Sequence, residues 1–198
     1  MRLGIFGGTF DPPHAGHLMV AQDAVDVLAL DRVVFVPASV PPHKQNRPIT
    51  PAAIRLAMLE AATADNDRFG VDDIELRRDG PSYTVDTLRA LRARHPDAEL
   101  VLLLGADQYA ELGTWRAPDV IVRLARIGVL TRGGTAGTAG EGAVHVPVTR
   151  IDLSSTDVRE RVALGKSIRY LVPDGVIRII KDYRLYSLQP GGRELEQE

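Results

Sequence analysis

The chain opens with Met1-Arg-Leu-Gly-Ile-Phe-Gly-Gly-Thr-Phe-Asp-Pro-Pro-His-Ala-Gly-His17, and this stretch decides its fold. The apolar run Leu3–Phe6 predicts a buried strand, and the pair Gly7-Gly8 predicts a tight turn after it. Helical spacing begins at about Gly16. A strand, a glycine turn and a helix in this order place backbone N–H groups where an anion can approach. The stretch therefore predicts a phosphate site.

Two histidines stand at the entrance of the predicted helix, at His14 and His17. Residues three apart on a helix can face the same side, so the two imidazoles can act on one ligand. Each can donate a hydrogen bond to an oxyanion. A metal pair would need further protein ligands, and only Asp11 is close in the sequence, so we expect no protein-held metal.

The glycine spacing of this turn excludes two common nucleotide-binding classes. The glycines stand at positions 4, 7 and 8, without the Gly-x-Gly-x-x-Gly spacing of dinucleotide-binding oxidoreductases. The turn also lacks the Gly-Lys-Ser/Thr ending of a P-loop. Hydride transfer and P-loop hydrolysis are both disfavoured.

Composition sets the broad class. The chain has 198 residues, a formal net charge of −2 and no cysteine. This length suits one domain with a small appended lobe, and the charge does not favour nucleic-acid or membrane-surface binding. The absence of cysteine excludes disulfides and thiolate catalysis. No apolar run approaches a transmembrane length and no signal segment is recognised, so we expect a cytoplasmic protein.

Apolar runs alternate with helical patterns along most of the chain. A strand, a helix and a strand at the start predict a right-handed βαβ unit with parallel pairing. We therefore predict an α/β, Rossmann-like, doubly wound and mainly parallel sheet, in one domain over residues 1–188 with a C-terminal helical lobe over about 151–188 and a flexible tail over 189–198. The predicted strands cover 3–6, 33–36, 69–76, 100–104, 127–131 and 144–148, and the predicted helices cover about 16–30, 51–64, 83–95, 120–126, 155 onwards and 173–183.

Three features outside the first turn invite a functional interpretation. Lys44 lies in a long proline-rich loop that either reaches over the glycine turn or is simply solvated. Asp107 follows directly on the strongest strand signal, where open α/β sheets place ligand groups. Trp115, the only tryptophan, is either a packing anchor or a stacking platform, and its flanks of glycine, threonine and arginine weaken the packing case. Residues 133–142 are rich in glycine and predict a surface loop.

A second anion-binding element follows the sixth predicted strand. Ser154 or Ser155 is suited to cap a helix, Asp157 lies in its first turn, and Arg159 stands one turn in. The pattern fits a capped helix with a solvated arginine, or a helix N-terminus plus a guanidinium that grips phosphate. Two such elements in one α/β cleft indicate a nucleoside triphosphate and a second phosphorylated substrate. Group transfer would then need positioning, cations and magnesium, without a covalent nucleophile.

Several motifs together resemble a known family. The stretch Gly7–His17 and the stretch Ser154-Ser-Thr-Asp-Val-Arg159 are similar to the signature pair of the His-x-Gly-His nucleotidyltransferase superfamily. The sequences Val40-Pro-Pro-His-Lys-Gln-Asn46, Gly80-Pro-Ser-Tyr-Thr-Val-Asp-Thr-Leu88 and Gly105-Ala-Asp107, with Trp115, resemble bacterial nicotinate-nucleotide adenylyltransferases. The resemblance implies AMP transfer from ATP to nicotinate mononucleotide, giving deamido-NAD and pyrophosphate, in NAD biosynthesis. It implies Mg²⁺ bound with ATP, and it leaves homo-oligomerisation open.

The resemblance also implies roles for individual residues. A catalytic set would stabilise the reacting phosphorus and the departing pyrophosphate: His14, His17, Lys44 and Arg159. A second set would bind ATP: Gly7, Gly8, Thr9, Phe10, His17, Gly105, Asp107, Ser154, Ser155, Thr156 and Arg159. A third set would bind nicotinate mononucleotide, with Trp115 stacking on the ring: Thr9, Lys44, Tyr83, Thr84, Asp107 and Trp115. Magnesium would be held mainly by the ATP phosphates.

Two alternatives stay open from the sequence. Phosphopantetheine adenylyltransferase shares the histidine motif and the serine-rich motif, but it is shorter and is not expected to carry the Pro-Ser-Tyr-Thr and Trp115 elements. A non-catalytic nucleotide-binding module could use the same fold, because fold does not determine function. The presence of His14, His17, Lys44 and Arg159 together argues against such a module.

Overall fold

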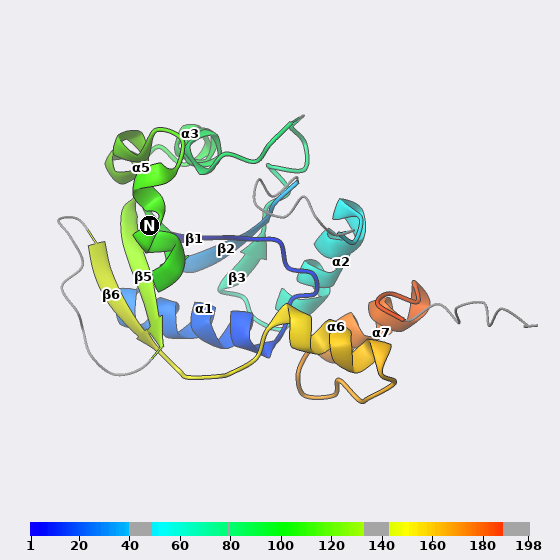
Figure 1. Cartoon of the computed structure of the whole chain (residues 1–198). Coiled ribbons are helices and arrows are strands. Elements are labelled where there is room, and N and C mark those ends of the chain that lie inside the picture. Colours follow the sequence, from blue (N-terminus) through cyan, green and yellow to red (C-terminus); the bar gives the residue numbers. More distant parts are fainter. Residues whose placement is uncertain (40–48, 79, 133–142, 188–198) are drawn as a thin grey trace, which may run out of the picture.

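The protein is described here by a computed structural model that covers residues 1–39, 49–78, 80–132 and 143–187 (Figure 1). Strands and helices alternate along the chain as the apolar pattern predicts. In order, the elements are β1 (Arg2–Gly8), α1 (Ala15–Leu28), β2 (Arg32–Pro37), α2 (Ala52–Thr63), β3 (Phe69–Val71), α3 (Thr84–Arg94), β4 (Glu99–Gly105), α4 (Ala106–Ala110), the 3₁₀ turn η1 (Leu112–Thr114), α5 (Pro118–Leu124), β5 (Arg126–Arg132), β6 (Ala143–Val148), α6 (Ser155–Ala163) and α7 (Asp174–Asp182).

The six strands form one sheet in the order β3-β2-β1-β4-β5-β6, and every adjacent pair is parallel. β1 lies at the centre, where Ile5 is in register with Val34 of β2 and with Leu102 of β4. The chain winds outward from β1 in both directions, so the strand order reverses between β1 and β4. The predicted doubly wound parallel sheet is confirmed, and its switch point is the place where such folds bind ligands.

Helices cover both faces of the sheet (Figure 1). Along β4, Leu102 belongs to an apolar cluster with Leu88 of α3 and Ile121 of α5. Its neighbour Leu103 belongs to a second cluster, on the α1 side of the sheet, with Val25. Successive strand residues point to opposite faces, and a strand that is covered on both sides is therefore apolar throughout. This is why residues 100–104 read as an unbroken apolar run.

The last two helices pack away from the sheet. α6 and α7 share a third apolar cluster with α2, built around Met58, Val158, Val176 and Ile180. In Figure 1 they lie beside α2, beyond the end of α1. The predicted tail over 189–198 lies outside the described residues, and the domain bounds of 1–188 and 151–188 stay predictions.

Local geometry corrects two of the predicted elements. The predicted third strand over 69–76 is too long, because Asp72 accepts a hydrogen bond from the Ile74 N–H at 2.9 Å and turns the chain after Val71. The first helix ends at Leu28 instead of about residue 30, because Ala29 takes a left-handed conformation with φ 48°. The short elements α4 and η1 were not predicted, since both are shorter than two helical turns.

Candidate active site

A cavity of about 780 Å³ opens at the carboxyl ends of the strands, beside the switch point. Its volume falls in the range of sites for small ligands and cofactors. Residues from five strands (β1, β2, β4, β5 and β6) and from five helices (α1, α3, α4, α5 and α6) line it, together with loop residues. Those that the sequence singled out are Gly7, Gly8, Thr9, Phe10, His14, His17, Tyr83, Thr84, Gly105, Trp115, Ser154, Ser155, Thr156 and Arg159.

The two histidines form the entrance of α1. His14 is the N-cap residue with an extended backbone, and its N–H donates to Nδ1 of His17 at 3.2 Å. The two ring centroids are 3.7 Å apart and the ring planes are tilted by 31°. A backbone N–H can only donate, so Nδ1 of His17 is an acceptor and the proton of the neutral ring is on Nε2. His17 is therefore set up to donate through Nε2.

Glycines make room for these rings. A Cβ at Gly16 would lie 3.0 Å from two atoms of the His14 imidazole and 3.3 Å from Ile151. A Cβ at Gly8 would lie 2.8 Å from the ring of Phe10, which packs edge-on against His17 with centroids 5.0 Å apart. Side chains at these two positions would displace the imidazoles. The glycines in the motif are therefore required by packing as well as by backbone access to an anion.

The second anion element is the start of α6. Ser154 is its N-cap: its hydroxyl accepts from the Asp157 N–H at 3.2 Å, and its N–H donates to the Asp157 carboxylate at 2.7 Å. The Ser154 hydroxyl also donates to that carboxylate at 2.6 Å. The capping interpretation of Ser154 is therefore confirmed. Asp157 belongs to the cap, and the hydrogen bonds from Ser154 lower its pKa from the ordinary 3.8.

This cap predicts a pH-dependent contribution to stability. Because the pKa of Asp157 is lowered on folding, its stabilisation is present above the ordinary pKa and is lost as the pH falls through the lowered one. We expect Asp157→Asn to lower Tm at pH 7, and we expect the gap to wild type to close as the pH falls below about 4. Thermal unfolding monitored by circular dichroism across this range measures the gap. Asp67→Asn, at an exposed position, is the control, and a gap independent of pH would contradict the prediction.

Direct hydrogen bonds join the two anion elements. Arg159 donates from Nη1 to the carbonyl oxygen of Asp11 at 2.8 Å and from Nη2 to the Thr156 hydroxyl at 2.8 Å. Ser155 donates from its hydroxyl to the carbonyl oxygen of Pro12 at 2.8 Å. Residues at least 143 positions apart in the chain thus meet at the loop between β1 and α1, which we call the histidine loop. The structure brings the two elements into one site, as the predicted cleft for two phosphorylated substrates needs.

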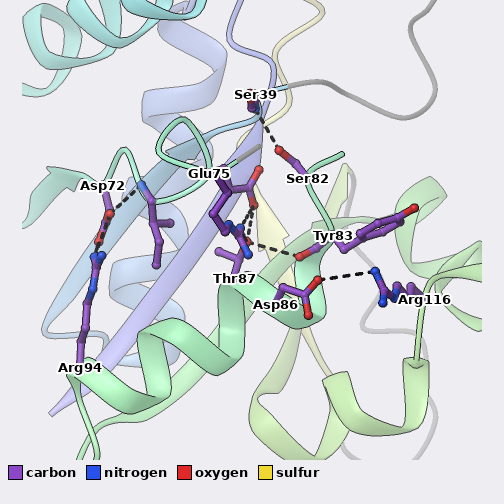
Figure 2. A network of polar contacts seen from close by, with 11 residues as sticks. Ser39, Asp72, Glu75, Ser82, Tyr83, Asp86, Thr87, Arg94 and Arg116 are labelled. Carbon is purple, nitrogen blue, oxygen red and sulfur yellow. Dashed lines mark hydrogen bonds and ion pairs between the residues drawn. The ribbon is translucent and has the colours of Figure 1, made fainter. Parts of the chain in front are cut away.

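Aromatic groups form the opposite side of the cavity. Tyr83 precedes α3, and Trp115 is half-buried, lines the cavity and packs against the apolar cluster of that face. The packing interpretation of Trp115 is therefore confirmed, and its role as a stacking platform stays a prediction. Arg116 places its guanidinium carbon 4.6 Å from the centroid of the Tyr83 ring and forms an ion pair with Asp86 at 3.8 Å (Figure 2).

Two buried polar side chains, Glu75 and Thr87, line the same cavity, and sequence reasoning missed the carboxylate of Glu75. Thr87 donates to Glu75 at 2.6 Å, and Arg78 donates to Thr87 and pairs with Glu75 (Figure 2). Both Glu75 and Thr87 line the cavity, and each is less than a tenth exposed. Glu75 falls within the stretch that was predicted as a strand. A carboxylate is costly to bury without partners, so the pairing with Arg78 and Thr87 is what allows it there.

Two predicted site residues are not among the described residues that line the cavity. Lys44 lies outside the described residues. Asp107 is exposed on α4 and is not among the described residues that line the cavity, where the next residue, Gln108, takes part instead. Gln108 accepts a hydrogen bond from the Gly105 N–H at 3.3 Å, which orders the turn after β4. The binding role that the resemblance implies for Asp107 stays a prediction.

The donor set of the site suits phosphate oxygens. Imidazoles, a guanidinium and a helix N-terminus all offer hydrogen-bond donors or positive charge. Over residues 1–39, 49–78, 80–132 and 143–187, no three His, Cys, Asp or Glu side chains are grouped closely enough to hold a metal ion. The residues that line the cavity therefore fit a phosphate ligand. In the same ranges no helix is long and apolar enough to cross a membrane.

The fold and the site together define a nucleotidyltransferase: a doubly wound sheet with a histidine loop and a capped helix at its switch point. The family model described as Cytidylyltransferase-like matches residues 5–161. A probable nicotinate-nucleotide adenylyltransferase of Exiguobacterium sibiricum is 45% identical over 189 residues, covering 94% of this chain and 100% of the relative. A relative of the same description from Thermomicrobium roseum is 47% identical over 195 residues, covering 93% and 91%. The chain belongs to the nicotinate-nucleotide adenylyltransferase family within this cytidylyltransferase-like group.

Solved structures agree on the fold. The nicotinic acid mononucleotide adenylyltransferase of Plasmodium falciparum complexed with NaAD superposes with a TM-score of 0.76 at 18% identity, covering 93% of this chain and 97% of that one. The same enzyme complexed with APC gives the same score. At this level of identity the likeness supports the architecture alone.

Proposed function

We propose that this chain transfers the adenylyl group of ATP to nicotinate mononucleotide, giving deamido-NAD and pyrophosphate. The observation that carries the proposal is the union of the two anion elements: Arg159 and Ser155 of α6 are hydrogen-bonded to the loop that leads to His14 and His17. The same cavity continues to Trp115, which offers a ring surface for a heteroaromatic base. A site with a triphosphate end and an aromatic end suits these two substrates. Family membership points to the same reaction.

In this reaction the 5′-phosphate oxygen of nicotinate mononucleotide attacks the α-phosphorus of ATP. A new P–O bond forms as the bond to the bridging oxygen breaks, and pyrophosphate leaves with the bonding electron pair. His17 donates from Nε2 to the α-phosphate oxygens, and His14 supports the same charge. Arg159 and the N-terminus of α6 hold the β- and γ-phosphates. No side-chain nucleophile is needed when the two substrates are held in line.

The remaining assignments follow the motifs. The backbone of Gly7, Gly8, Thr9 and Phe10 faces the phosphates, and Tyr83 and Thr84 flank the nicotinate ring. The roles of Lys44 and Asp107 rest on the sequence resemblance. Mg²⁺ is expected to enter with ATP and to screen phosphate charge, and the protein's part is to bind the phosphates. We further propose a cytoplasmic enzyme that acts as a single domain over residues 1–188.

One assay tests the proposal. The protein is incubated with ATP, magnesium and nicotinate mononucleotide, and pyrophosphate release is measured. Parallel reactions replace the mononucleotide by nicotinamide mononucleotide or by phosphopantetheine. Release with nicotinate mononucleotide supports the proposal. Release with phosphopantetheine alone would assign the chain to the alternative adenylyltransferase, and ATP binding without release would indicate a non-catalytic module.

The aromatic end of the cavity predicts a selective effect on one substrate. Trp115→Ala should raise KM for nicotinate mononucleotide roughly 5- to 150-fold, because stacking of a base on an aromatic side chain contributes ~1–3 kcal/mol. KM for ATP should change little. Trp115→Phe retains a ring face and should recover part of the affinity. Steady-state kinetics with each substrate varied in turn measures both constants, and an effect confined to ATP would reject the stacking role.

A further inference from the structure

The segment after α7 contacts the histidine loop through the side chain of Tyr186. Tyr186 donates from its hydroxyl to Oδ1 of Asp11 at 2.6 Å and accepts from the Thr50 hydroxyl at 3.3 Å. Asp11 is only 2% exposed, so this carboxylate depends on protein groups for its hydrogen bonds. Burial and the neighbouring carboxylate raise the pKa of Tyr186, so the phenol stays a donor. Tyr186 and Asp11, 175 positions apart in the chain, are thus in contact at the histidine loop.

Thr50 links this contact to a second buried group. Its N–H donates to Oδ2 of Asp11 at 3.3 Å, and its carbonyl oxygen accepts from Nε of Arg55 at 2.9 Å. Arg55 is 1% exposed and also donates to the carbonyl oxygens of Thr9 and Ala38, both at 2.8 Å. We call Asp11, Thr50, Arg55 and Tyr186 the buried brace. It ties together the loop after β1, the loop after β2, the entry of α2 and the C-terminal segment.

The phosphate-binding groups are attached to one member of this brace. The carbonyl oxygen of Asp11 accepts the hydrogen bond from Arg159, and the next carbonyl, of Pro12, accepts from Ser155. His14 follows two residues later and begins α1. A shift of Asp11 would therefore move the arginine, the α6 N-terminus and the histidines relative to one another. These are the groups that must fit one triphosphate at the same time.

We propose that Tyr186 is a positioning residue for adenylyl transfer: through Asp11 it sets the spacing between the histidine pair and the α6 anion site across the ATP phosphates. The proposal rests on the proposed function. The C-terminal segment thereby contributes to the site even though Tyr186 is not among the described residues that line the cavity. This contact adjoins the ATP half of the site, whereas the two rings of the aromatic half precede α3 and follow η1.

The kinetic test uses Tyr186→Phe, which retains the ring and removes the hydroxyl. kcat/KM for ATP should fall roughly 10- to 100-fold, as expected when reacting groups are displaced by about 1 Å. KM for nicotinate mononucleotide should stay within about twofold of wild type, since its ring contacts are on the other side. Tyr183→Phe is the matched control, because Tyr183 is three residues earlier and exposed. It should leave both constants unchanged.

A second readout does not depend on activity. In histidine-labelled protein without nucleotide, the NMR signals of the His14 and His17 rings should shift in Tyr186→Phe, and those of His95 and His145 should stay. The control variant should shift none of them. If wild type releases no pyrophosphate, the proposed function fails, and these shifts still decide the positioning role.

Two results would overturn the proposal: unmoved His14 and His17 signals in folded Tyr186→Phe, or a rise of KM for nicotinate mononucleotide as large as the fall of kcat/KM for ATP. If that variant does not fold, Thr50→Val decides instead. It removes the hydroxyl that donates to Tyr186, and it should lower kcat/KM for ATP and shift the His14 and His17 signals in the same way, but by less. Wild-type kinetics and signals in Thr50→Val would then reject the proposal.

Discussion

Replacing His17 by alanine is expected to lower kcat roughly 10²- to 10³-fold, the usual effect of losing one donor to a developing oxyanion. The reason is geometric. Nδ1 of His17 accepts from the His14 N–H at 3.2 Å, so its remaining nitrogen is the donor. The ring is held between Phe6 and Phe10, with centroids 6.2 and 5.0 Å away, and costs no reorganisation during reaction. KM for nicotinate mononucleotide should change little.

The alanine variant also removes the acceptor for the His14 N–H, and a second substitution separates the two effects. His17→Asn keeps a side-chain oxygen near the helix start but places its donors differently, so it should restore stability more than turnover. His95→Ala is the control for loss of an imidazole, because His95 follows the far end of α3. Turnover of His17→Ala within about threefold of wild type would show that the imidazole is structural.

Replacing Arg55 by methionine is expected to lower the free energy of unfolding by about 3–5 kcal/mol, the range for removing one partner from a buried charged network. Arg55 is 1% exposed, and burial lowers its pKa while the nearby Asp11 raises it. Methionine fills much of the volume but leaves the carbonyl oxygens of Thr9, Ala38 and Thr50 without these donors. The Asp11 carboxylate also loses its neighbouring positive charge.

Urea denaturation at neutral pH measures this loss, and Tm should fall by about 2–4 °C for each kcal/mol at this chain length. Arg123→Met is the matched control. Arg123 is exposed on α5 and pairs with Asp119 at 2.7 Å, and exposed pairs of this kind contribute ~0–1 kcal/mol. A loss in Arg55→Met no larger than in this control would mean that water replaces the guanidinium at no cost, and the buried brace would then have no part in stability.

The sequence predicted those features whose signal is local. Residues 100–104 are apolar throughout because β4 is covered on both faces, and the strand was found at Glu99–Gly105. Ser154 and Asp157 sit at capping positions, and they do cap α6. The third strand was overextended because Ile74 and Glu75 are buried in a turn, and burial alone does not distinguish a turn from a strand.

The least predictable parts of the site are contacts between distant segments. Glu75 has no local signal of function in the sequence, and only the structure shows that it lines the cavity and accepts a hydrogen bond from Thr87. Arg55 lies in the predicted helix over 51–64 without a local signal that singles it out, and it is the most completely buried charge among the described residues. Tyr186 had no signal at all. Its role depends on a contact with Asp11 across nearly the whole chain.

The sequence by itself determined the α/β class, the order of the main elements and the two anion motifs at Gly7–His17 and Ser154–Arg159. These follow from hydrophobic period, turn chemistry and capping, which act within a few residues. The tertiary structure confirmed that the two motifs share one cavity, and it alone showed that Gln108 lines this cavity beside the exposed Asp107 and that the buried brace supports it. These features depend on which loops lie side by side at the carboxyl ends of the strands, and the packing of distant segments determines this.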